Sequence, residues 1–251
     1  MRAGFVAIVG RTNVGKSTLV NGLVGEKVAI VTPKPQTTRN VIRGILNEPR
    51  GQVVFLDTPG LHRPRTRMNR SMVRMALDSV EGVDAVLWML EVQRPWLAEE
   101  KQISQRLHAA ARPVLVAINK VDELPDKSAL LPLMGKLSGL FPGAPIYPLS
   151  ALNPADYPGL LDLLFPLIPE GEPFFPADLY TDQPERQLAA EIVREHAFRH
   201  TREEVPHCIG VLVESFAEPG TEGEKVTIHC SVLVERESKK PIVIGKGGQN
   251  L

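Results

Sequence analysis

The stretch GRTNVGKS, at Gly10–Ser17, decides the fold of this chain. It has the form G-x-x-x-x-G-K-S, in which the glycines let the backbone curl around an anionic phosphate so that successive N–H groups point inward. An apolar run at 5–9 precedes it, and residues 17–24 follow it with the apolar spacing of a helix. A strand, a glycine-bearing loop and a helix in this order favour a phosphate-binding loop over a turn that matches by chance.

The residue types in this loop suit contact with a nucleotide. Lys16 would contact the β and γ phosphates, and Ser17 would supply a hydroxyl to Mg²⁺. Both therefore become candidate site residues. The candidate nucleotide-binding residues in the loop and at the start of its helix are Gly10, Asn13, Val14, Gly15, Lys16, Ser17 and Thr18.

A second motif, Asp57-Thr58-Pro59-Gly60, follows the apolar run at 53–56. On its own the tetrapeptide is typical of an ordinary turn. Its position after an apolar strand predicts instead that Asp57 acts on Mg²⁺ through water and that the Gly60 N–H bonds the γ-phosphate. Departure of that phosphate would then remove the Gly60 hydrogen bond.

A third motif, Asn119-Lys120-Val121-Asp122, ends the apolar run at 114–118. This is the edge where open α/β sheets bind ligands. The Asp122 carboxylate can accept hydrogen bonds from the N1–H and the 2-amino group of guanine, and adenine lacks both donors. Such bonds contribute about 1.5–3 kcal/mol each, so a pair would discriminate by roughly a hundredfold or more. Asn119 would support the loop and the Lys120 stem would cover the ring, so the two motifs together predict GTP and GDP as ligands.

Ser150-Ala151-Leu152 follows a short run at 146–149 and would complete the base site. The Ala151 N–H can donate to the guanine O6. The tripeptide carries no signal by itself, and it gains meaning only from the motifs before it.

Composition excludes little. The 251 residues have no formal net charge and are 43% hydrophobic, which allows one large domain or two modest ones, and we favour two. No apolar run approaches the roughly 20 residues that would span a bilayer. Met1 lies almost directly before the first strand and leaves no room for a cleavable signal, so we expect a cytoplasmic protein. The two cysteines, Cys208 and Cys230, are expected to be unpaired and buried.

Apolar and helical segments alternate along the first two thirds of the chain. This alternation predicts an α/β fold of the P-loop NTPase type, with a mostly parallel sheet and helices on both faces. The expected strands lie near 4–10, 40–46, 52–57, 83–90, 113–119 and 145–149, and the expected helices near 16–24, 68–80, 98–111, 127–139 and 158–168.

Prolines punctuate the stretch that follows, which has no periodicity and is interpreted as a linker. We therefore divide the chain into a nucleotide-binding domain at 1–169, a linker at 170–183 and a partial α+β domain at 184–251. In the last part, 185–200 is expected to form a helix, and 208–216 and 226–236 are expected to form strands. This helix would place Leu188, Ile192 and Val193 on one side.

The second part closes with Gly245-Lys246-Gly247-Gly248 after an apolar lead-in. KH domains use a G-x-x-G loop to clamp the backbone of about four nucleotides, because glycines allow sugar and phosphate to approach closely. A plain glycine turn is the alternative interpretation. The helix and two strands expected before this loop favour the KH interpretation.

The ordered set GRTNVGKS, PQTTR, DTPG, NKVD and SAL, followed by a linker and VIGKGG, resembles the bacterial Era GTPases over essentially the whole chain. The resemblance implies a Ras-like G domain joined to a type II KH domain that recognises the 3′ end of small-subunit (16S) ribosomal RNA during 30S maturation. It implies a GTPase that forms GDP and phosphate with Mg²⁺, and an RNA partner rather than DNA. The RNA-binding residues would be Gly245, Lys246, Gly247 and Gly248.

The resemblance also assigns Gln36-Thr37-Thr38-Arg39 to the family's switch I motif. Thr38 would supply the second hydroxyl to Mg²⁺ in the GTP state, which makes Ser17, Thr38 and Asp57 the expected metal-site residues. The alternative is a polar loop without such a role, but a γ-phosphate sensor is needed at this place between the first helix and the second strand.

Leu61 stands where Ras-like enzymes carry the glutamine that orients the attacking water. Leucine cannot orient water, so we hypothesise that backbone groups hold it and that Asn13 helps bind a K⁺, as in similar potassium-stimulated GTPases. A cationic side chain from an RNA-bound partner is the competing source of charge. The candidate catalytic residues are Lys16, Thr38, Gly60 and Asn13.

The segment after Leu61 is strongly basic. A solvated surface is the ordinary explanation. Contact with RNA or an acidic lipid surface is the alternative, since the family is reported at both ribosome and membrane, and peripheral association with the inner face of the cell membrane belongs to the expectation. The residues are Arg63, Arg65, Arg67, Arg70 and Arg74.

Residues 185–251 carry eleven acidic and nine basic side chains, so attraction of RNA to this part must be local. It would come from Arg236, Lys239, Lys240 and Lys246. A type II KH fold continues past its G-x-x-G loop with two helices and a strand, so we expect the second domain to be truncated and weak in RNA affinity. A membrane-associated signalling GTPase without an RNA role and a P-loop ATPase or kinase stay open as alternatives, the latter disfavoured by Asn119 and Asp122.

Overall fold

The computed structural model describes residues 1–63, 67–93, 96–201, 205–217 and 225–250. The chain divides into two compact units. The first contains Met1–Ala29 and Thr38–Asp182, and the second contains Ile30–Thr37 and Gln183–Leu251. The short segment Ile30–Thr37 therefore belongs to a different unit from the residues on either side of it, which matters for the site below.

The first unit is a six-stranded sheet with the strand order β2-β3-β1-β4-β5-β6. Strand β2 runs antiparallel to β3, and the other neighbours are parallel, which confirms the expected mostly parallel α/β sheet. The strands are β1 (Arg2–Gly10), β2 (Ile42–Glu48), β3 (Gly51–Asp57), β4 (Ala85–Glu91), β5 (Val114–Asn119) and β6 (Ile146–Pro148).

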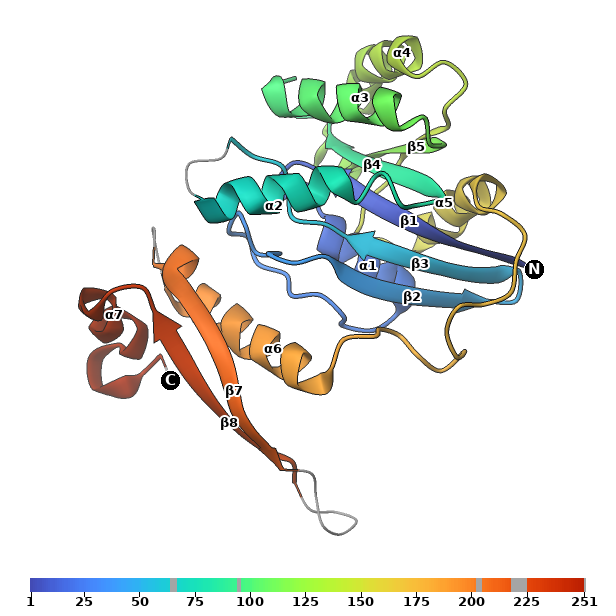
Figure 1. The fold of residues 1–251 in the computed structure, drawn as a ribbon. Coiled ribbons are helices and arrows are strands. Elements are labelled where there is room, and N and C mark those ends of the chain that lie inside the picture. The colour runs from blue at the N-terminus through green and yellow to red at the C-terminus, as the bar shows by residue number, and fades with distance from the viewer. Residues whose placement is uncertain (64–66, 94–95, 202–204, 218–224, 251) are drawn as a thin grey trace. The chain divides into compact units, whose positions relative to one another are not determined.

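Helices cover both faces of this sheet (Figure 1). Helices α1 (Lys16–Val24) and α5 (Tyr157–Leu164) supply leucines and valines to the core on one face. On the other face the core includes residues of α2 (Arg67–Asp78), α3 (Ala98–Ala110) and α4 (Leu130–Leu140). Because the central strands are buried on both faces, they read in the sequence as near-continuous apolar runs.

The register brings the carboxyl ends of four parallel strands to one edge of the sheet. Gly10 at the end of β1 pairs with Met89 of β4, and Glu91 at the end of β4 pairs with Asn119 of β5. Asp57 at the end of β3 pairs with Ile8 of β1. The motifs that follow β1, β3 and β5 in the sequence are thereby gathered at a single edge.

Residues 170–182, expected to be a linker, pack along β2 and β3 within the first unit. The backbone N–H groups of Phe174 and Phe175 donate to the Gln52 side-chain oxygen at 2.8 and 3.1 Å. Nearer the end of the stretch, the Ile45 N–H donates to the Tyr180 carbonyl at 2.8 Å. Buried Gln52 therefore ties this irregular stretch to β3.

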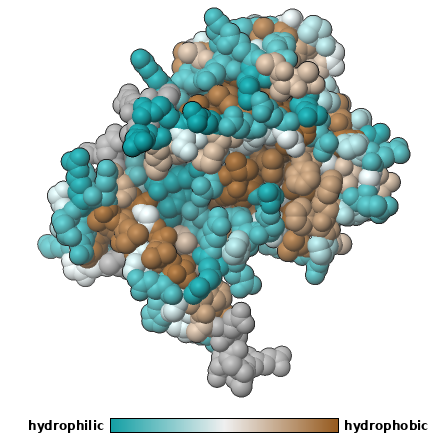
Figure 2. All heavy atoms as spheres, viewed as in Figure 1, coloured by the Kyte–Doolittle hydropathy of each residue, from teal (hydrophilic) through white to brown (hydrophobic). Residues whose placement is uncertain are grey.

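The second unit contains helix α6 (Glu185–His200), the antiparallel strands β7 (Ile209–Ala217) and β8 (Thr227–Val234), and helix α7 (Lys240–Ile244). A small cluster of Val205, Ile209 and Val243 is buried within it. Apolar side chains of the two strands are also exposed, Leu212 and Leu233 among them, and Figure 2 shows hydrophobic atoms at the surface here.

Helix α6 and the two cysteines differ from what their sequence patterns favour. Ile192 is exposed, and the buried residues of α6 are Arg194, Glu195 and Phe198. Helical periodicity identifies a buried side by its apolar residues. This helix instead buries charged groups that bond the backbone of Ile30–Thr37. The two cysteines are free as expected, but both are half-buried rather than buried.

Candidate functional site

The loop between β1 and α1 adopts a conformation that requires glycine. Gly15 has φ 98° at the start of α1, in the left-handed region. A Cβ atom on Gly15 would lie 2.3 Å from Asn119 Nδ2, and a Cβ atom on Gly10 would lie 2.5 Å from the Met89 carbonyl oxygen. Both glycines are therefore fixed by close packing, and Gly15 by its conformation as well.

Lys16 lies buried beneath this loop. Its Nζ donates to the carbonyl oxygens of Gly10 at 3.3 Å and Arg11 at 3.0 Å, which holds the side chain along the curl of the loop. Burial lowers the pKa of Lys16 to about 8, and the negative charge of Asp57 opposes that shift. A buried cation placed in this loop suits a polyanionic ligand, which would restore the favourable charge environment.

Three oxygen-bearing side chains from separate segments meet beside the loop. Ser17 Oγ donates to Asp57 Oδ2 at 2.6 Å and lies 3.0 Å from Thr38 Oγ1. Burial raises the pKa of Asp57 to about 6, against the opposing effects of Lys16, Ser17 and Thr38. Asp57 Oδ1 is buried and has no hydrogen-bond partner among the described residues. The two hydroxyls and the Asp57 carboxylate, one oxygen of which has no partner, fit a hard divalent cation such as Mg²⁺.

The segment after Asp57 runs against the phosphate loop. The Leu61 N–H donates to the Gly10 carbonyl at 3.0 Å, and the Thr12 N–H donates to the Leu61 carbonyl at 3.3 Å. A Cβ atom on Gly60 would lie 2.6 Å from Thr12 Cα, so glycine permits this close approach. The Leu61 side chain is buried in the core, consistent with the expectation that it does not orient water.

Asn119 joins three loops. Its Nδ2 donates to the Val14 carbonyl at 2.7 Å, and its Oδ1 accepts from the Ala151 N–H at 2.8 Å. The side chain is buried, so both groups would be costly to leave unpaired. One amide thereby fixes the phosphate loop relative to both segments expected to read the base.

The remaining base-site residues differ in exposure. Lys120 has φ 65°, and its Nζ lies 2.9 Å from Glu91 Oε1 at the end of β4. Asp122 is exposed in a short turn at Val121–Glu123, so its carboxylate is accessible to a base. Glu91 was not expected from the sequence, because an acidic residue at a strand end has no distinguishing pattern.

The Ser150–Leu152 loop is held by residues that the sequence did not single out. The Ser150 N–H donates to Asp156 Oδ2 at 2.7 Å, and the Tyr157 hydroxyl donates to the Ala151 carbonyl at 2.9 Å. The Ala151 N–H, expected to serve guanine O6, donates to Asn119 in this structure. A base that uses this N–H would share it with Asn119.

The glycine-rich loop of the second unit has an open backbone. Gly245, Gly247 and Gly248 all have positive φ, at 75°, 66° and 83°. Among the described residues, no heavy atom lies within 4 Å of a Cβ placed on Gly247 or Gly248, and Lys246 between the glycines is exposed. The Asn250 N–H closes the loop by donating to the Ile244 carbonyl at 3.2 Å. An extended phosphodiester backbone can approach such a loop closely.

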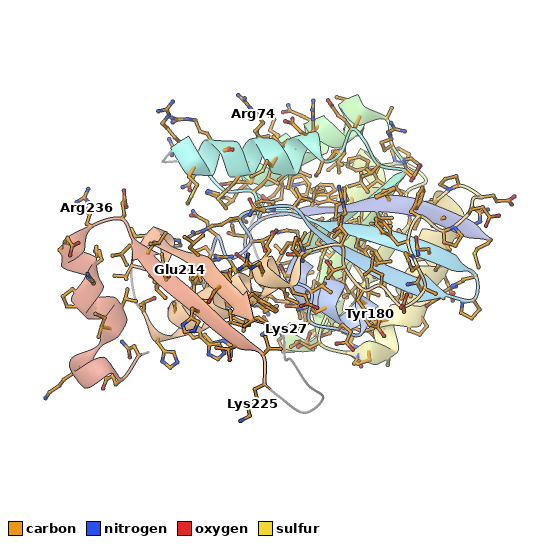
Figure 3. All side chains as sticks on the ribbon, turned by 60° about the horizontal axis from the view of Figure 1, so that its bottom comes forward. Lys27, Arg74, Tyr180, Glu214, Lys225 and Arg236 are labelled. Atoms are coloured by element: carbon orange, nitrogen blue, oxygen red, sulfur yellow. The ribbon has the colours of Figure 1, made fainter. Side chains whose placement is uncertain are left out.

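Four of the five arginines expected in the basic segment are exposed: Arg63, Arg67, Arg70 and Arg74. The fifth, Arg65, lies outside the described residues. Arg74 points away from the sheet (Figure 3). Arg70, Arg74 and Arg106 line a groove of about 620 Å³ between α2 and α3. Among the described residues, no helix is both long and apolar enough to cross a membrane.

Comparison with family models gives a different family for each of the two units. Residues 5–120 match a family described as 50S ribosome-binding GTPase, and residues 204–251 match the KH domain family. The two matches fall on the α/β unit and on the unit that carries the glycine-rich loop.

Comparison with whole proteins extends over the full chain. The chain is 47% identical to GTPase Era of Geotalea daltonii over 99% of its own length and 83% of the relative's, and 45% identical to GTPase Era of Nitrosomonas eutropha over 100% and 83%. A crystal structure of an Aquifex aeolicus Era variant bound to GDP.AlF4⁻ aligns with a TM-score of 0.94 at 42% identity, covering 100% of this chain and 85% of that one. A crystal structure of Era in complex with MgGDPNP and nucleotides 1506–1542 of 16S ribosomal RNA gives the same score and identity, covering 100% and 84%.

Proposed function

Because the chain belongs to the family of Era GTPases, we propose that it binds and hydrolyses GTP, binds the 3′ end of 16S ribosomal RNA and assists assembly of the 30S subunit. The observation that carries the nucleotide part is the joining of the phosphate loop to both base-reading loops by Asn119. A single ligand that contains phosphates and a guanine base would contact all of these segments.

The phosphates bind at Gly10–Thr18. Backbone N–H groups of Asn13, Val14 and Gly15 surround them, and Lys16 contributes a cation that is already desolvated and positioned. Asp122 reads the base, with Asn119 and Lys120 as supports. Ser150, Ala151 and Leu152 border the base on the other side.

Ser17, Thr38 and Asp57 hold Mg²⁺, with Asp57 acting through water. The ion neutralises charge on the β and γ phosphates as the bond between them breaks. The Gly60 N–H bonds the γ-phosphate, so Thr38 and Gly60 both respond to its presence. Their two segments are the parts of the site that change between GTP and GDP.

The side chain at position 61 is a buried leucine, so no glutamine at this position orients the attacking water. The charge that develops in the transition state needs a cation as well. We propose that Asn13, which has φ 64° in the phosphate loop, helps bind K⁺ there. Turnover measured in K⁺ should exceed turnover in Na⁺ at equal ionic strength, and Asn13→Ala should remove the difference. Equal rates in the two salts would refute the K⁺ site and leave an RNA-bound partner as the source of charge.

The RNA-binding part rests on the loop at Gly245–Gly248 and on nearby cations. Gly247→Asp adds a negative charge where a Cβ meets no neighbour, so it should weaken binding to a 16S 3′-end oligonucleotide at least about tenfold through charge repulsion. Gly143→Asp is the matched control, because Gly143 also has positive φ and open space around it but lies in the first unit. Equal RNA affinity of the native chain and Gly247→Asp would overturn the assignment.

The exposed arginines of the segment 63–74 favour a second candidate, peripheral binding to the inner face of the cell membrane. Vesicles that contain anionic lipid should sediment with the native chain and less with Arg70→Glu/Arg74→Glu, while neutral vesicles should not. Lack of sedimentation with either vesicle, together with RNA affinity that falls in the same double variant, would assign these arginines to RNA.

A further inference from the structure

Helix α6 buries two charged residues side by side, and both face the segment Ile30–Thr37. Arg194 and Glu195 are 3% and 1% exposed, the values of core residues. Burial of charge is costly unless partners are provided. Each has an ion-pair partner on the helix, Glu191 for Arg194 and Arg199 for Glu195. Both also bond backbone groups that lie about 160 positions earlier in the chain.

Arg194 donates from Nη2 to the Thr37 carbonyl oxygen at 2.7 Å. Glu191, one turn earlier on the helix, accepts from Arg194 Nε at 2.9 Å and pairs with Nη2 as well. The guanidinium also lies over the Phe198 ring at 5.2 Å. Glu191 and the Phe198 ring therefore both hold the planar guanidinium, which makes it a rigid donor to the Thr37 carbonyl.

Three further contacts hold the same segment. The Val31 N–H donates to Glu195 Oε1 at 3.3 Å, and Lys34 Nζ donates to the carbonyl oxygens of Phe198 and Thr201 at the end of α6. Inside the segment, Thr32 Oγ1 and Thr37 Oγ1 lie 2.7 Å apart. The segment is thus fixed near its start, its middle and its end by one helix.

Thr37 is joined directly to Thr38, whose hydroxyl lies 3.0 Å from Ser17 Oγ in the metal cluster. The Thr37 carbonyl belongs to the peptide group that precedes Thr38, so a rigid donor on that oxygen restricts the orientation of Thr38. We propose that Arg194 is a positioning residue for the GTPase site, which acts through the Thr37 carbonyl to hold the Thr38 hydroxyl ready for Mg²⁺. This inference rests on the proposed binding of GTP with Mg²⁺.

In the proposed function Thr38 contacts Mg²⁺ in the GTP state and not in the GDP state, so loss of Arg194 should affect the two nucleotide states differently. Arg194→Gln should weaken binding of the non-hydrolysable analogue GDPNP about tenfold, raise the Mg²⁺ concentration needed for that binding and leave GDP affinity unchanged. Arg194→Lys keeps the charge and one donor nitrogen but not the planar fork of donors, and should give an intermediate loss.

Titration calorimetry of the full chain with GDPNP and GDP, over a series of Mg²⁺ concentrations, tests this. Arg186→Gln is the matched control, an exposed arginine of the same helix. In a Thr38→Ala background, Arg194→Gln should cause no additional loss of GDPNP affinity. Equal weakening of GDP and GDPNP, or unchanged GDPNP affinity, in Arg194→Gln would overturn the proposal.

Thermal unfolding shows whether each variant is folded. Should Arg194→Gln not fold, Arg194→Lys carries the test: a loss confined to GDPNP supports the proposal, and no loss or an equal loss for GDP overturns it. Failure of the proposed function can be told apart from failure of this inference. The native chain itself would then show no Mg²⁺-dependent binding of GDPNP.

Discussion

The Asn119 side chain donates to the Val14 carbonyl at 2.7 Å, and this bond joins the base-reading motif to the phosphate loop. The same amide accepts from the Ala151 N–H, so neither motif is positioned independently. Truncation of Asn119 should therefore affect the whole nucleotide rather than its base alone.

Asn119→Ala leaves a buried carbonyl and a buried N–H without partners. We expect a loss of about 2–4 kcal/mol in the free energy of unfolding and a parallel loss of affinity for GTP and GDP. Urea unfolding and calorimetry measure the two quantities. Asn47→Ala, which removes a half-buried amide bonded to the Ala177 carbonyl and to the Gln52 side chain, is the control and should cost less, about 1 kcal/mol, because Gln52 Nε2 keeps its bond to the Phe175 carbonyl. If Asn119→Ala were as stable as the native chain, Asn119 would not be the residue that joins the loops.

Asp122→Asn should change base preference without that loss of stability, because Asp122 is exposed. The Nδ2 group of the substituted amide can donate to the C2 carbonyl of xanthine, but it cannot accept from the guanine 2-amino group as the second carboxylate oxygen does. Affinity for GTP should fall roughly a hundredfold and affinity for xanthosine triphosphate should rise, as competition binding would show. Glu123→Gln, at the next exposed position, should leave both affinities unchanged. An Asp122→Asn chain that still prefers GTP would argue against the base site.

Gly15→Ala and Gly25→Ala separate conformational strain from steric overlap. Both glycines have positive φ, but a Cβ on Gly25 meets nothing within 4 Å, whereas one on Gly15 would lie 2.3 Å from Asn119 Nδ2. Gly25→Ala should cost about 1–2 kcal/mol of stability. Gly15→Ala should cost about 1–3 kcal/mol more, because it also displaces Asn119. Thermal unfolding of both variants provides the comparison, and equal costs would exclude the overlap.

Asp57 predicts a pH dependence of stability in the nucleotide-free protein. Burial raises its pKa from 3.8 to about 6, so its contribution to stability is complete below pH 3.8 and is lost as the pH rises through about 6. Relative to Asp57→Asn, the native chain should lose up to about 1.4 kcal/mol per pH unit between about pH 4 and 6. Urea unfolding across this range, with nucleotide removed and chelator present, tests it.

The control for this titration is Asp178→Asn, which removes an exposed carboxyl group. Its free energy of unfolding should follow that of the native chain over the same pH range. A difference between native chain and Asp57→Asn that does not change with pH would mean that Asp57 ionises in the folded protein as it does in the unfolded chain.

Local motifs explain why so much of the first unit could be predicted. The phosphate loop, the DTPG turn and the NKVD segment each follow a buried apolar strand, and parallel strands place their carboxyl ends together. The bond from Asn119 to Val14 was not predictable, because it joins positions about a hundred residues apart through a backbone carbonyl, which carries no side-chain signal.

The buried side of helix α6, by contrast, could not be predicted from the sequence. Its buried side is set by Arg194 and Glu195, which read as surface residues in any hydrophobic pattern. Besides Glu191 and Arg199 on the helix itself, their partners are backbone atoms of Ile30–Thr37, a segment expected to lie in the first domain. Polar burial that depends on distant backbone groups leaves no periodic trace, and so the role proposed for Arg194 required the structure.

Nucleotide selectivity tests the account most directly. Calorimetric titration of the native chain with GTP and with ATP, each in the presence of Mg²⁺, should show GTP binding tighter by roughly a hundredfold or more. Comparable affinities for the two nucleotides would contradict the guanine site on which the proposed function depends.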